Sequence, residues 1–99
     1  MVYDGTATVV TAGTKVPLLP VVTKADWVTI YPGQANSGTI YVGGSTVNAA
    51  SDRGAPIMAG GAFVLWPVAT GIHGIYDLSL VFVDSTSSGD TVTFVYARS

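Results

Sequence analysis

His73 is the only histidine in the chain, so any chemistry that needs an imidazole depends on this one side chain. A metal site needs two or three further ligands around the ion. The available carboxylates are scattered aspartates without ligand spacing: Asp4, Asp26, Asp52, Asp77, Asp84 and Asp90. We therefore expect no metal centre and no cofactor. His73 is interpreted as a loop residue that forms hydrogen bonds or contacts a partner.

The segment from Asp84 to Asp90 carries side-chain oxygens at alternate positions, as a calcium-binding loop does. An EF-hand loop ends with a bidentate Glu at its twelfth position, and that position is Val95 here. Asp and Ser side chains commonly bond to the backbone groups of a turn. We therefore predict a turn held by its own side chains.

Motifs of enzyme catalysis are missing from the sequence. No G-x-S-x-G elbow presents a serine for a Ser-His-Asp triad. The segment Gly43-Gly-Ser-Thr46 lacks the Lys that a phosphate-binding loop places before its Ser or Thr. We predict that the protein is not an enzyme.

Four aromatic side chains could bind a ligand without catalysis: Trp27, Tyr31, Tyr41 and Trp66. Exposed rings of this kind form platforms for sugars or anchors in protein interfaces. All four lie within strand patterns, which favours packing in the core. Trp66 is retained as a candidate partner contact.

The elements that position these groups are strands. Apolar and polar residues alternate in residues 75–83 and 91–96, with the period of two that is typical of β-strands. Small turn-forming residues separate the two segments, which predicts an antiparallel hairpin with a positive φ at Gly89. In this alternation Phe82 and Phe94 belong to the apolar set of residues, and we predict that both side chains face the core.

Residues 26–31 and 38–42 predict a second antiparallel pair, and Gln34 and Asn36 in the connecting loop are candidate partner contacts. Nowhere do apolar residues recur with helical spacing. About eight short strands separated by turns predict an all-β fold, an antiparallel β-sandwich or jelly roll.

One domain accounts for residues 1–99, within which residues 1–22 are interpreted as an extended arm or an edge strand. A proline cannot donate to a β-ladder, so Pro17 disfavours a central strand. Two prolines bracket two leucines that a monomer has little reason to expose. We therefore predict partner contacts at Pro17, Leu18, Leu19 and Pro20.

The composition indicates a surface that other protein covers. Charged residues make up 10% of the chain and hydrophobic residues 48%, against about 25% charged in an ordinary domain. No apolar run reaches the roughly 18 residues of a membrane-spanning helix. A net charge of −2 with four cations also argues against nucleic acid. The absence of cysteine suits assembly in a reducing cytoplasm.

Seven segments follow one another between residues 27 and 96: Trp27-Val-Thr-Ile, Gly38-Thr-Ile-Tyr-Val-Gly43, Ser45-Thr-Val-Asn-Ala49, Gly54-Ala-Pro-Ile57, Leu65-Trp66, Leu78-Ser-Leu-Val-Phe-Val-Asp84 and Ser88-Gly-Asp-Thr-Val92. This succession resembles small structural proteins of tailed bacteriophage particles. The resemblance is one of strands and turns and carries over no catalytic residue.

The resemblance implies a capsid decoration or cement protein with a β-sandwich or jelly-roll fold, which binds the major capsid protein or other virion proteins and is often a trimer. The composition agrees, because neighbours in a lattice cover surface that would otherwise carry charges. The alternative is a fibre-tip or carbohydrate-binding module of the same fold, which would use exposed aromatic side chains and the loop of Gln34.

Overall fold

The structure is a computed structural model that describes residues 1–58, 60–65 and 74–98. This part of the chain forms ten strands, no α-helix and one short 3-10 turn, η1 (Ala49–Ser51). The strands are β1 (Val2–Val9), β2 (Val16–Pro17), β3 (Lys24–Ala25), β4 (Trp27–Pro32), β5 (Ile40–Gly43), β6 (Ala55–Ile57), β7 (Phe63–Leu65), β8 (Tyr76–Asp77), β9 (Phe82–Ser85) and β10 (Asp90–Ala97). The prediction of an all-β fold is confirmed.

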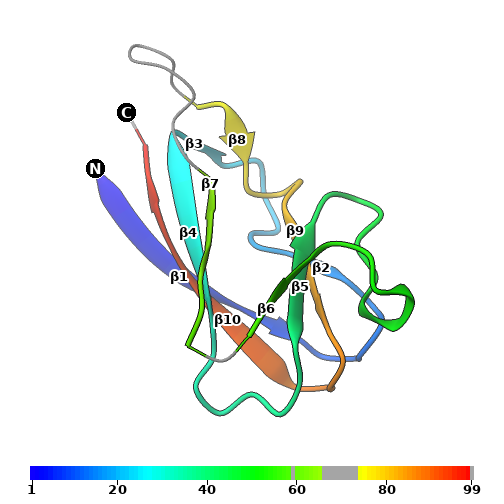
Figure 1. Cartoon of the computed structure of the whole chain (residues 1–99). Helices are drawn as coiled ribbons and strands as arrows, with labels where there is room; N and C mark the ends of the chain where they lie inside the picture. The colour runs from blue at the N-terminus through cyan, green and yellow to red at the C-terminus, as the bar shows by residue number, and fades with distance from the viewer. Residues whose placement is uncertain (59, 66–73, 99) are drawn as a thin grey trace.

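The described strands form two four-stranded antiparallel sheets and one short pair, β3 with β8. The first sheet has the order β1-β10-β4-β7 and the second sheet the order β2-β9-β5-β6. The two sheets lie on opposite sides of the molecule in Figure 1, with the β3–β8 pair at one end. Side chains from both sheets meet in one buried cluster, which is a sandwich-like arrangement.

Both predicted hairpins are wrong. β9 pairs with β2 and β5, whereas β10 pairs with β1 and β4, so the turn between them passes from one sheet to the other. β4 and β5 are likewise in different sheets. Alternation shows which face of a strand is buried, but two strands that face each other across a core alternate in the same way as two paired strands.

The core is built from one face of each sheet. Its largest fully buried side chains come from both sheets and from the segment before β9: Phe94, Ile30, Ile40, Leu78, Val9, Val28, Val83 and Val92. The ring of Phe94 lies against Gly5 on the neighbouring β1, where an added Cβ would come within 2.6 Å of the ring. Gly5 therefore leaves room for the central aromatic side chain of the first sheet.

The phase predicted for residues 75–83 is wrong at Phe82. Leu78 is fully buried, but the chain then turns, with Leu80 N–H donating to the Asp77 carbonyl at 2.9 Å, and Leu80 is exposed. After this turn Val83 enters the core, and the next two residues, Asp84 and Ser85, are buried as well. Phe82 is half-buried, with the Lys15 ammonium 5.7 Å from its ring centroid. Gly89 does adopt the predicted positive φ, at 87°.

Residues 1–22 are not a detached arm. β1 pairs with β10 over its whole length and is the edge strand of the first sheet, and β2 is an edge strand of the second. The two chain ends are hydrogen bonded, because Met1 and Arg98 exchange bonds between their backbone groups at 2.9 and 3.0 Å. Figure 1 shows the termini side by side.

We expect Phe94→Ala to lower the free energy of unfolding by about 3–5 kcal/mol, since it empties a fully buried aromatic site. Phe82→Ala should cost about 1 kcal/mol, because its ring is only half-buried. Urea denaturation of both variants measures the difference. Equal losses of unfolding free energy in the two variants would contradict the finding that Phe94 is buried in the core and Phe82 is not.

Candidate functional site

The four residues predicted as contacts at positions 17–20 differ in their exposure. Leu18 is a buried core residue, and its N–H donates to the Val81 carbonyl at 2.9 Å, so its prediction as a partner contact is wrong. Leu19 packs against the core and is half-buried, as is Pro17 in β2. Pro20 is exposed, and the exposed Val21 and Val22 follow it. The surface available in this region is therefore Pro20 to Val22.

Gln34 and Asn36 lie in the same loop but have different environments. The Asn36 amide donates to the Thr91 carbonyl at 2.7 Å, and its oxygen accepts from the Thr91 N–H at 2.8 Å. Asn36 thus fixes the loop against β10 in the way a neighbouring strand would. Gln34 is exposed.

Trp66 and His73 lie outside the described residues. Trp27, at the start of β4, is half-buried. Tyr41 is half-buried and donates to the Asp52 carboxylate, a hydrogen bond that raises the Tyr41 pKa above its ordinary value. Tyr31, 44% exposed, presents the most accessible ring of the three described aromatic candidates, Trp27, Tyr31 and Tyr41.

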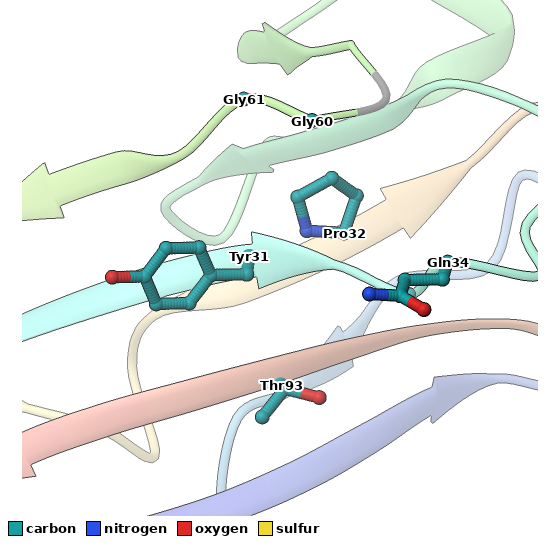
Figure 2. A pocket seen from close by; sticks show the side chains of 7 residues that line it. Tyr31, Pro32, Gln34, Gly60, Gly61 and Thr93 are labelled. Atoms are coloured by element: carbon teal, nitrogen blue, oxygen red, sulfur yellow. The ribbon is translucent and has the colours of Figure 1, made fainter.

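Tyr31 and Gln34 line a surface pocket of about 440 Å³ at the end of β4. The other lining residues are Pro32, Gly33, Gly60, Gly61 and Thr93. In Figure 2 the Tyr31 ring and the Gln34 amide extend from the same segment, Thr93 lies on the neighbouring β10, and the two glycines of the β6–β7 turn lie opposite. Sequence reasoning selected Gln34 but could not place it beside Gly60 and Thr93, which are far apart in the chain.

The pocket can bind a ligand by stacking and hydrogen bonding. Its lining contains no carboxylate, imidazole or ammonium group among the described residues. The exposed Tyr31 ring offers an apolar face, whereas Gln34 and Thr93 offer donors and acceptors at its margin. This lining suits recognition of a neutral molecule rather than acid–base chemistry.

A second pocket, of about 290 Å³, is lined by residues at the end of β5, in β7 and just before β9. Its lining is apolar or glycine: Val42, Gly43, Gly44, Phe63, Leu65, Leu80 and Val81. The exposed Leu80 side chain belongs to this lining. Without a polar group to orient a ligand, this pocket is a surface for packing rather than for specific binding.

Two of the aspartates, Asp84 and Asp90, are buried inside the fold. Asp84, with no exposed surface, accepts hydrogen bonds from the backbone N–H groups of Gly13 and Ala49 at 3.0 and 2.8 Å. A third bond comes from the N–H of Ser85 at 2.8 Å. Because residues 13 and 49 belong to distant loops, one carboxylate holds three segments together.

Asp90 has the same role at the other end of this turn. It is 4% exposed and accepts from the N–H groups of Ser37 and Gly38 at 3.0 and 2.9 Å. The Ser85 hydroxyl donates to the same carboxylate at 2.7 Å. The prediction that Asp and Ser side chains of this segment bond to backbone groups is confirmed, and these carboxylate oxygens already have partners.

The pKa values of two carboxyls follow from these environments. Burial raises the pKa of Asp90. The hydrogen bonds from Ser85, Ser37 and Gly38 lower it, and together they outweigh burial, so the pKa lies below its ordinary value. The pKa of Asp77 is lowered mainly by the hydroxyl of Ser79. Burial opposes that effect, and backbone N–H groups and the Lys24 ammonium, 3.7 Å away, add to it.

The outer surface is poor in charge. All ten charged side chains lie in the described part of the chain, and four of the aspartates are buried or half-buried. The exposed ones are Asp4, Lys15, Lys24, Asp52, Arg53 and Arg98. Large exposed hydrophobic residues outnumber them: Met1, Val2, Tyr3, Val10, Val21, Val22, Tyr31, Met58 and Leu80.

Within the described residues, no group of three or more His, Cys, Asp or Glu side chains is placed to hold a metal ion. The same residues form no helix with the length and hydrophobicity needed to span a membrane.

Comparison of the chain with protein-family models, curated proteins and solved structures finds no match.

We expect Asp84→Asn to lower the free energy of unfolding by about 1–3 kcal/mol, because an amide replaces one acceptor oxygen with a donor that faces backbone N–H groups. Asp52→Asn is the matched control, since Asp52 is exposed, an Asn oxygen can still accept from the Tyr41 hydroxyl, and Asn tolerates the left-handed φ of 56°. Thermal unfolding of both variants makes the comparison. Similar midpoints for Asp84→Asn and the wild type would contradict the role of Asp84.

The lowered pKa of Asp90 predicts a loss of stability in acid. A carboxyl whose pKa is lower in the folded state stabilises the fold above its unfolded pKa of about 3.9, and this stabilisation disappears as the pH falls through the folded value. We therefore expect unfolding midpoints to fall below about pH 4. Asp90→Asn should be less stable at neutral pH and show a shallower acid dependence. An unchanged acid limb in this variant would rule out Asp90 as a cause.

Proposed function

We propose that this chain is a non-enzymatic structural protein of a bacteriophage virion, a decoration or cement protein of the head shell. Its partner is the major capsid protein, and it assembles in the host cytoplasm as a homo-oligomer, preferably a trimer. The resemblance of residues 27–96 to small phage structural proteins supports the virion, and the surface of the fold supports a role in packing against other protein.

The observation that carries the proposal is the excess of exposed hydrophobic over exposed charged side chains. Nine large hydrophobic residues and six charged ones are exposed in the described part of the chain. A free monomer normally covers its surface with charges, whereas a subunit in a lattice is covered by its neighbours. The exposed pair Val21 and Val22 and the exposed residues Met1, Val2 and Tyr3 are candidates for such contacts.

The free edge of β1 is the strongest candidate for a contact with protein. Met1 and Arg98 exchange hydrogen bonds, so by the alternation of an antiparallel ladder the odd residues of β1 bond to β10. The N–H and C=O groups of Val2, Asp4, Thr6 and Thr8 therefore point to the open edge. This edge contains no Lys and no Pro, the residues that commonly prevent strand addition.

A protein that binds the assembled shell and not the loose subunits stabilises the shell by mass action. Hydrogen bonding along an open edge suits this role, because main-chain groups supply affinity without surface charge. The buried carboxylates hold loops of the sandwich in place, among them the loop that follows β1.

The proposal is tested by incubating the purified protein with expanded head shells of the phage that encodes it. We expect the protein to sediment with the shells, to appear at symmetric positions in electron cryomicroscopy maps and to raise the temperature at which the shells disrupt. Protein that remains in the supernatant, or that is found only on the tail, would contradict a cementing role.

Thr6→Lys should weaken association through the edge of β1, since a lysine there disfavours addition of another strand. We expect less of the oligomer in light scattering at micromolar concentration and weaker binding to shells, with little change in monomer stability. Thr46→Lys, at an exposed loop position, is the matched control. Equal behaviour of the two variants would place the contact surface elsewhere.

A further inference from the structure

The pocket at the end of β4 has one open aromatic face and a neutral polar margin. Tyr31 and Thr93 are direct cross-strand partners, and both side chains lie on the outer face of the first sheet, where each is exposed. The Gln34 amide follows two residues after β4, and Figure 2 shows it extending over the same surface as Thr93. The pocket volume of about 440 Å³ lies within the range of small-molecule sites.

The lining selects the chemistry of the ligand. Phosphate and carboxylate ligands would find no cation among the described lining residues, and an amine would find no carboxylate. A purely apolar ligand would bury the amide of Gln34 and the hydroxyl of Thr93 without partners, which is unfavourable. A pyranose ring has an apolar face for Tyr31 and equatorial hydroxyls for the two polar groups.

The site is also held in shape before any ligand arrives. Gly33 N–H donates to the Thr91 carbonyl at 2.8 Å, and Asn36 bonds to both backbone groups of the same residue. The segment that carries Gln34 is therefore attached to β10 on both sides of Gln34. Prior order of this kind reduces the entropy lost on binding.

We propose that this pocket binds a neutral saccharide, with Tyr31 stacking on the sugar ring and Gln34 and Thr93 bonding to its hydroxyls. Asn36 is a positioning residue. This proposal does not depend on binding to the head shell. Of the four aromatic candidates it selects Tyr31 as the platform, because Trp27 is half-buried and Trp66 lies outside the described residues.

The test is a titration of the ¹⁵N-labelled protein with maltotriose, cellotriose and chitotriose, followed by amide chemical shifts. We expect at least one of these sugars to shift the amides of Gly33, Gln34 and Gly61 in a saturable way at millimolar concentration. Tyr31→Ala should weaken that binding about tenfold or more, which corresponds to about 1.4 kcal/mol. Tyr31→Phe, which retains the ring, should remain within about threefold of the wild type.

Thr93→Val removes the hydroxyl at constant volume and should weaken binding several-fold. Leu80→Ala, in the apolar second pocket, is the control and should leave binding unchanged. Amide spectra of each free variant verify that it is folded. The proposal is overturned if none of the three sugars shifts these amides, if Tyr31→Ala binds as well as the wild type, or if the amides respond only to capsid subunits.

Discussion

The fold depends on hydrogen bonds from backbone amides to two buried carboxylates. The chain passes from the second sheet to the first between β9 and β10, and loops from three other regions meet at this crossing. Strand pairing cannot satisfy the N–H groups of those loops, and a buried amide without a partner is costly. Asp84 and Asp90 accept them at either end of the crossing, and Ser85 joins the two sites.

This arrangement links the interior to the surface. Four of the six aspartates lie buried or half-buried, so the few charges of the sequence contribute even less to the exterior than their number indicates. The exterior of the described residues includes an open strand edge, exposed valines, six exposed charged side chains and the pocket at Tyr31. Such an exterior is consistent with the proposal that neighbouring proteins of a virion cover this surface. The uncharged pocket at Tyr31 is consistent with the proposed neutral ligand.

The sequence could predict the all-β class, the positive φ of Gly89 and the bonding of the Asp84–Asp90 segment, because period-two alternation and turn chemistry are local. It could not predict which strands pair. Both expected hairpins proved to be crossings between sheets, and Leu18 proved to be core, because pairing depends on the whole set of strands. The pocket could not be predicted from the sequence either, since Gln34, Gly60 and Thr93 are brought together only by tertiary structure.

Hydrogen exchange of the loop amides tests most directly whether the carboxylates organise the fold. The N–H groups of Gly13, Ser37, Gly38 and Ala49 lie outside the strands, and each donates to Asp84 or Asp90. If these bonds hold the crossing together, the four amides should exchange only through global unfolding, at the rates of the protected amides of β10. Rapid exchange of these amides in a protein whose β10 amides stay protected would contradict the account.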